Sequence, residues 1–103
     1  MNYFKGTPGP WFVDGFGDVN DTKEITEETL CIAACRGVLD IDRDRHNAKL
    51  IAAAPELLDV AIRMRNQLYA AGYHSKQKSL NQTECMLYQL ESAIAKALGE
   101  SNE

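Results

Sequence analysis

The spacing of apolar residues along this chain changes near residue 40. Before that point, three short β-prone runs are separated by turn residues: 11–13, 16–20 and 29–35. Asp14-Gly15 readily supplies the positive φ of a hairpin turn, and residues 20–23, Asn-Asp-Thr-Lys, are typical of a second turn. We therefore expect a β-meander over residues 11–37, which follows a turn-rich leader over residues 1–10.

The third of these runs is apolar on both of its sides. One side holds Leu30, Ile32 and Ala34, and the other holds Cys31, Ala33 and Cys35. A strand with one face in water alternates apolar and polar residues, so two apolar faces indicate a strand that is covered twice. We expect a central strand, covered either by helices of the same chain or by a second subunit.

Residues 40–99 have the spacing of amphipathic helices. Pro55 has no amide hydrogen and fits the first turn of a helix, so we expect one short helix to end at Ala54-Pro55 and another to begin there. The apolar face of this second helix ends at Gly72 and comprises Leu57, Leu58, Ala61, Ile62, Met64, Leu68 and Tyr69. A last helix starts at Ser79 with Gln82, or at Asn81 with Glu84, and residues 100–103 form a frayed tail.

Together these elements predict an α+β fold in a single domain, residues 1–103. A small antiparallel three-stranded N-terminal meander packs against a C-terminal helical hairpin, which is preceded by the short helix ending at Pro55. A chain of 103 residues that is 45% hydrophobic is large enough to bury one modest core.

Composition also indicates where such a chain resides. No apolar run approaches the roughly 20 residues of a membrane helix, and the first residues lack the layout of a secretory signal. We therefore expect a cytoplasmic protein without membrane contact. Three cysteines, an odd number, fit a reducing compartment, and we expect them to be buried as apolar residues rather than to hold a metal.

The net charge of −4 is unevenly distributed. Residues 1–30 carry six acidic and two basic side chains, whereas residues 31–54 carry four basic and three acidic ones. Extended nucleic acid is not an expected partner, because neutralisation of phosphates supplies most of its sequence-independent affinity. The basic middle can still bind a small anion, since arginine meets phosphate with two parallel hydrogen bonds.

The candidate ligand-binding residues are those that the end of the third strand and the start of the first helix would gather: Arg36, Arg43, Arg45, Asn47 and Lys49, with Trp11 as an aromatic platform for a base. An alternative reading is that the arginines pair with Asp40, Asp42 and Asp44 on a solvated helix.

Catalytic and cofactor signatures are missing from the sequence. His46 and His74 have no neighbouring nucleophile whose activation can be argued. The pair Gly15 and Gly17 is not followed by a helix, which a dinucleotide-binding turn requires. We therefore expect neither an enzyme nor a bound cofactor or metal.

One segment resembles a known group of proteins. Asn47-Ala48-Lys49-Leu50-Ile51-Ala52-Ala53-Ala54-Pro55-Glu56-Leu57-Leu58 is similar to a phrase that recurs in small accessory proteins of tailed bacteriophages and prophages, and the similarity extends to about Val60. The phrase Thr7-Pro8-Gly9-Pro10-Trp11 is similar to the opening of related proteins. The resemblance implies a phage origin and carries no catalytic signature.

Phage accessory proteins of this size commonly counter host defences, which the resemblance therefore implies here. We expect a non-catalytic homo-oligomer in the host cytoplasm that binds and sequesters a small anionic nucleotide-like signal. One alternative is an anti-CRISPR-like inhibitor that contacts a host defence protein through acidic residues: Asp14, Asp18, Asp21, Glu24, Glu27 and Glu28. Another is a structural or regulatory phage adaptor.

Overall fold

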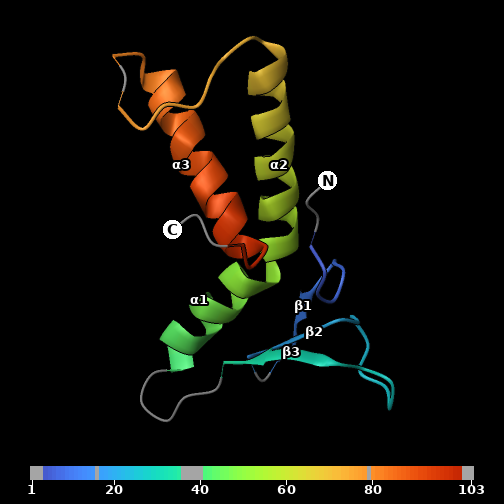
Figure 1. Cartoon of the computed structure of the whole chain (residues 1–103). Coiled ribbons are helices and arrows are strands. Elements are labelled where there is room, and N and C mark those ends of the chain that lie inside the picture. Colours follow the sequence, from blue (N-terminus) through green and yellow to red (C-terminus); the bar gives the residue numbers. More distant parts are fainter. Residues whose placement is uncertain (1–3, 16, 36–40, 79, 101–103) are drawn as a thin grey trace. The chain divides into compact units, whose positions relative to one another are not determined.

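The computed structural model describes residues 4–15, 17–35, 41–78 and 80–100. In these ranges three strands precede three helices: β1 (Phe12–Val13), β2 (Asp18–Asn20), β3 (Cys31–Ala34), α1 (Ile41–Ala52), α2 (Ala54–Ala70) and α3 (Gln82–Ala97) (Figure 1). The predicted α+β class, with its N-terminal antiparallel sheet, is confirmed.

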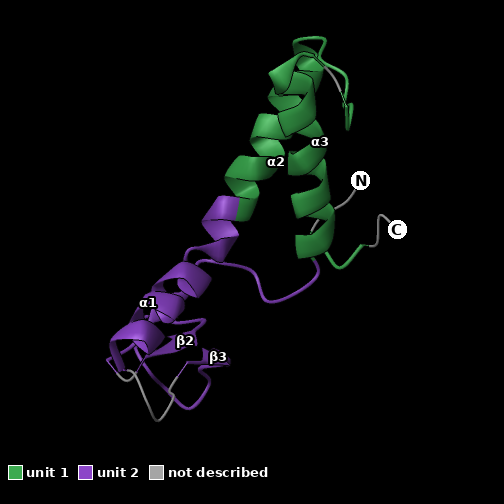
Figure 2. Ribbon diagram, turned by 90° about the vertical axis from the view of Figure 1, so that its left-hand side faces the viewer, with its two compact units in different colours: residues 1–4, 58–103 green, residues 5–57 purple. Residues whose placement is uncertain are grey.

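The chain divides into two compact units, which Figure 2 distinguishes by colour. We call residues 5–57 the sheet unit, and residues 58–103 together with residues 1–4 the helical unit. The boundary falls within α2, whose first residues belong to the sheet unit.

The three strands pair antiparallel in the order β1-β2-β3, with Val19 opposite both Val13 and Ala33. The Asp14 carboxylate closes the first turn, since it accepts hydrogen bonds from the Asp18 amide at 3.1 Å and from Asn20 Nδ2 at 2.9 Å. The second bond satisfies Asn20, a buried polar side chain that would be costly to leave unpaired. The predicted reversal therefore forms, but its positive φ of 88° lies at Gly17, so the expectation that Asp14-Gly15 supplies it is wrong.

The expectation of a central third strand is wrong, because β3 lies at the edge of the sheet and β2 occupies the centre. Cys31 is exposed, and Cys35 and Cys85 are only partly buried, so the expected burial of the cysteines is wrong as well. An apolar run shows that a strand can be covered, but its place in a sheet depends on which other segments pair with it.

Within the sheet unit, α1 packs against all three strands. Ala48 of α1 and Val19 of β2 are its fully buried hydrophobic side chains among the described residues. From the sequence we expected the helical hairpin to pack against the sheet. Within the sheet unit, the helix that packs against the strands is α1.

The predicted interruption at Pro55 is confirmed, because α1 ends at Ala52 and α2 begins at Ala54. Proline there lies in the first turn of α2, where it has no amide bond to lose.

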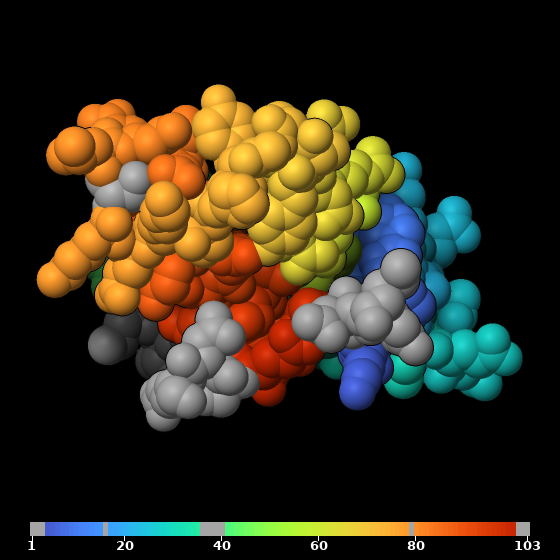
Figure 3. All heavy atoms as spheres, turned by 45° about the horizontal axis from the view of Figure 1, so that its top comes forward, coloured from blue at the N-terminus to red at the C-terminus, as the bar shows by residue number. Residues whose placement is uncertain are grey.

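In the helical unit, α2 and α3 run side by side and antiparallel (Figures 1 and 2). Figure 3 shows the C-terminal part of α2, in yellow, against α3, in red. The buried side chains described in this unit come from α3 and are Leu87, Ile94 and Ala95, and α2 has none.

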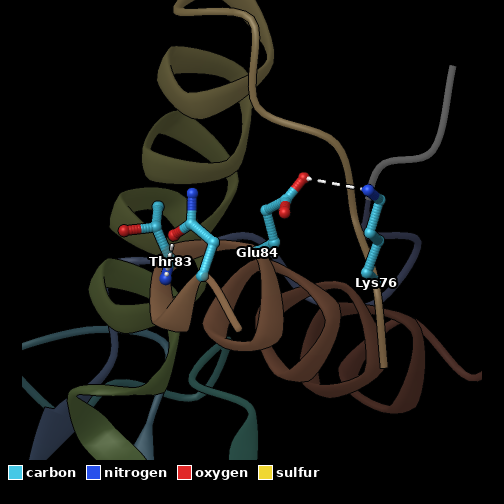
Figure 4. Close-up of polar contacts among 4 residues, drawn as sticks. Lys76, Thr83 and Glu84 are labelled. Atoms are coloured by element: carbon cyan, nitrogen blue, oxygen red, sulfur yellow. Dashed lines mark hydrogen bonds and ion pairs between the residues drawn. The ribbon is translucent and has the colours of Figure 1, made fainter. Parts of the chain in front are cut away.

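Local signals at the helix ends behave as the sequence indicates. Asn81 caps α3, because its side-chain oxygen accepts the Thr83 amide hydrogen at 2.9 Å (Figure 4). Ser79, the other predicted start, lies outside the described residues. Lys76 in the preceding connector pairs with Glu84 of the first turn at 3.8 Å. Gly72 has a φ of 91°, which lets the chain leave α2 with the Tyr73 amide bonded to the Leu68 carbonyl.

Candidate functional site

The basic residues predicted to bind a ligand lie on α1, except Arg36, which falls outside the described residues. Arg43, Arg45, Asn47 and Lys49 are all exposed. Residues four apart share a helix face, so Arg43 lies beside Asn47, and Arg45 lies beside Lys49 on a different face. The helix therefore presents two small polar pairs rather than one cradle, and the ligand-binding role stays a prediction.

Trp11, the predicted aromatic platform, is partly buried in the sheet unit. Its indole N–H donates a hydrogen bond to the Thr7 carbonyl at 3.1 Å. A tryptophan bonded in this way has its polar edge occupied by the leader. The observed contact is thus a structural one.

The two segments that resemble phage proteins meet in the sheet unit. A Cβ atom added at Gly9 would lie 2.5 Å from Pro55 Cβ, which is far inside van der Waals contact. The Thr7–Trp11 phrase therefore needs glycine at this position because the proline at the start of α2 lies directly against it. This contact gives both phrases a role in packing.

The connection between β2 and β3 is an ordered loop, which we call the acidic loop, residues 21–30. The Asp21 amide bonds to the Leu30 carbonyl at 3.0 Å, and the Asp21 carboxylate accepts the Leu30 amide hydrogen at 2.8 Å. Inside it, the Thr22 and Thr29 hydroxyls lie 2.7 Å apart, and the Thr29 hydroxyl also accepts the Thr26 amide hydrogen at 2.8 Å. These bonds fix the backbone of the loop without a hydrophobic core.

The outer surface of the acidic loop combines negative charge with two large apolar side chains. Ile25 is 61% exposed and Leu30 is 58% exposed. The neighbouring charged side chains are exposed too: Lys23, Glu24, Glu27 and Glu28. Surface loops often carry the residues that bind a partner, so the acidic loop is a candidate protein-recognition surface.

Five of the six acidic residues singled out from the sequence divide into two groups in the structure, and the sixth, Asp18, lies in β2. Asp14 and Asp21 hold the backbone of the sheet unit through their carboxylates. The side chains of Glu24, Glu27 and Glu28 are instead exposed to solvent. A partner with a positively charged surface would contact these three glutamates.

A polar pocket of about 580 Å³ lies in the helical unit, on one side of the α2–α3 pair. Its lining includes Arg65 and Tyr69 of α2 and Tyr88 and Glu91 of α3. The Tyr69 hydroxyl donates a hydrogen bond to Glu91, and the Arg65 guanidinium lies 6.0 Å from the Tyr69 ring centre. Burial and the bond to Glu91 raise the pKa of Tyr69 above its ordinary value of 10.0.

This pocket has the wrong charge for a phosphate. Arg65 is its one basic residue, whereas Glu91 and Glu100 both line it, so acidic groups predominate. An anionic nucleotide would meet repulsion there rather than the clustered arginines that phosphate recognition uses.

In the described residues no group of three or more histidine, cysteine, aspartate or glutamate side chains is arranged to hold a metal. The described helices include none that is both long and apolar enough to cross a bilayer.

Sequence reasoning missed Ile25, Leu30 and the threonines that frame the acidic loop. The available signal was the recurrence of Thr22, Thr26 and Thr29 in a stretch with neither strand nor helix periodicity. The pocket residues Arg65, Tyr69 and Glu91 gave no comparable signal, because their meeting depends on the register between two helices.

The chain matches no curated protein and no solved structure. A family model, described as Salmonella phage P22 protein Y8K6, matches residues 1–101. That match spans both segments whose phrases resemble phage accessory proteins, as well as the acidic loop and all the helices. The chain therefore belongs to the phage protein family of Salmonella phage P22 protein Y8K6.

Proposed function

We propose that this phage protein is a non-catalytic anti-defence protein that binds a host defence protein through the acidic loop. The observation that carries the proposal is the exposure of Ile25 and Leu30 beside Glu24, Glu27 and Glu28 on a loop whose backbone is already fixed. Such a surface offers apolar side chains that a partner can bury and negative charge that attracts a basic partner.

The order of the loop favours binding. Association is weakened by the entropy lost when flexible segments become fixed, and a loop held by the Thr22, Thr26 and Thr29 hydroxyls has less of that entropy to lose. Ile25 and Leu30 can then enter a partner's pockets without a folding step.

The charge of the loop indicates what kind of partner fits. Three exposed glutamates against one exposed lysine attract a basic surface, and they raise the association rate at low ionic strength. A defence effector that handles nucleic acid presents such a basic surface. The acidic loop would occupy it in place of phosphates.

Sequestration of a nucleotide-like signal is a second candidate function, and the exposed pair of Arg43 and Asn47 on α1 favours it. The separation of Arg45 and Lys49 onto another face, and the acidic lining of the polar pocket, weigh against it. Calorimetry with a panel of cyclic nucleotides and ADP-ribose isomers tests it. Heat of binding that Arg43→Ala abolishes would favour this candidate.

The decisive experiment for the protein-binding proposal compares capture and protection by two variants. Glu24→Lys, Glu27→Lys and Glu28→Lys are combined in one chain, and Glu56→Lys, a single charge reversal at an exposed position of α2 outside the loop, is the control. Each is expressed as the only copy in a phage that infects defence-carrying cells. We expect the triple variant to lose both plaque formation and co-purification of the host protein, and the control to retain both.

Two outcomes would contradict the proposal. One is unchanged capture and plaque formation by the triple variant, which would place recognition elsewhere. The other is capture of a phage protein by the acidic loop with no effect on defence, which would indicate an adaptor. A circular dichroism spectrum matching the wild type confirms that the triple variant is folded.

A further inference from the structure

The helical unit carries apolar side chains on a side of the α2–α3 pair that its own core does not use. We call these residues the outer stripe: Val60, Met64 and Leu68 of α2, and Met86, Leu90, Ala93 and Ala97 of α3. Val60 is 57% exposed, Met64 is 52% exposed and Met86 is 65% exposed. The stripe is thus a surface feature made of residue types that usually lie inside.

The two helices enclose a shallow groove on this side. Its volume is about 510 Å³, and it is lined by Met64, Leu68, Thr83, Met86, Gln89 and Leu90. None of these six side chains is ionisable. A groove with this lining suits an apolar occupant rather than a charged one.

The spacing of the stripe is that of a helix bundle. On α3 the stripe residues Met86, Leu90, Ala93 and Ala97 alternate four and three residues apart, and on α2 the stripe residues Val60, Met64 and Leu68 are each four residues apart. This alternation is the seam along which one helix packs into another. Each helix therefore has a second seam beside the one that joins α2 to α3, which is the pattern of half a four-helix bundle.

The internal core of the helical unit is too small to account for this pattern. Its buried hydrophobic side chains among the described residues are Leu87, Ile94 and Ala95, all from α3. The 17 residues of α2 include no buried side chain, and its apolar residues Leu58, Ala61, Ile62 and Leu68 are only partly buried. If a partner covered the outer stripe, the apolar side chains of Val60, Met64 and Leu68 would give α2 a buried face.

The size and charge of the stripe identify its occupant. The helix α3 has 16 residues and is about 24 Å long, and two packed helices present a face roughly 20 Å wide. Covering that face, about 24 Å by 20 Å, buries on the order of 500 Å² per copy, which is close to the lower end of the half-interface of a specific complex. Along the stripe, Gln67, Gln82 and Gln89 are neutral amides that both donate and accept hydrogen bonds, so each can pair with the same residue type of a second copy.

From these observations we infer that two copies of this chain pair through their outer stripes as a twofold four-helix bundle. A twofold interface places the same patch of both subunits in contact, so Met64 and Met86 of one copy fill the groove of the other. The outer stripe belongs to the helical unit, and the acidic loop belongs to the sheet unit. This inference is independent of the proposed function, since the two surfaces share no residue.

The test is sedimentation velocity of the full-length protein over a range of concentrations. We expect a dimer of twice the 11.5 kDa chain mass at low micromolar concentration. Met86→Glu places two buried charges in each dimer and should raise the dissociation constant at least about 100-fold. Leu80→Glu makes the same type of change at a fully exposed leucine outside the stripe and should leave the dissociation constant unchanged.

A measurement on the unmodified protein guards against a Met86→Glu variant that fails to fold. Oxidation of Met64 and Met86 by dilute peroxide, followed by peptide mass spectrometry, should slow at least fivefold as protein concentration rises through the dimer range. A wild type that stays monomeric at 100-fold higher concentration would overturn the inference. So would a dimer in which both methionines oxidise at the monomer rate, or one that Met86→Glu leaves intact.

Discussion

Gly9 shows how one absent carbon atom lets two distant segments pack together. The leader passes so close to Pro55 that a Cβ at residue 9 would overlap the proline ring, which is attached to the helix backbone and cannot turn away. The same leader is closed by the hydrogen bond from Trp11 to Thr7. The phage-like phrases are thus explained by contacts within the sheet unit.

This contact predicts that Gly9→Ala destabilises the protein by about 1–3 kcal/mol, the usual effect of forcing extra volume into a packed site. Gly15→Ala is the matched control, because a Cβ there would meet nothing within 4 Å. Urea unfolding measures both free energies. Equal stability of the two variants would contradict the packing role of Gly9.

Three helix boundaries show which elements local chemistry determines. Pro55 separates α1 from α2, Asn81 caps α3, and Gly72 ends α2 with a positive φ. Each was predictable because it depends on one residue and its neighbours along the chain. The edge position of β3 was not predictable in this way, because pairing with β2 is a contact between segments separated by the acidic loop.

For α3 we predict that Asn81→Ala lowers the free energy of unfolding by about 1 kcal/mol, since the Thr83 amide loses its acceptor. Asn47→Ala makes the same substitution in the interior of α1, where alanine is the better helix former, and should be neutral or slightly stabilising. Thermal unfolding followed at 222 nm compares the two. A loss of stability at residue 47 alone would contradict the assignment of the cap.

At the scale of the whole molecule, the two units offer two kinds of surface. The sheet unit presents the acidic loop, and the helical unit presents the outer stripe and the polar pocket. The negative charge of residues 14–28 could be predicted from the sequence, but the ordered conformation of the acidic loop could not. The loop is held by hydrogen bonds among three threonines, and such bonds produce no helix or strand periodicity in the sequence. From the sequence, the basic residues of α1 were predicted to form one binding site, but the helix places them on two different faces.

Charge and apolar anchors on one loop also predict how binding responds to salt. Contacts made by Glu24, Glu27 and Glu28 are screened as ionic strength rises, whereas those of Ile25 and Leu30 are not. The complex should therefore weaken with salt without being abolished.

Hydrogen–deuterium exchange of the protein, free and bound to its captured host partner, tests the central claim most directly. If the acidic loop is the recognition surface, the amides of residues 23–29 exchange more slowly in the complex, while those of α1 are unchanged. Protection confined to α1 or to the outer stripe, with the loop exchanging as in the free protein, would contradict it.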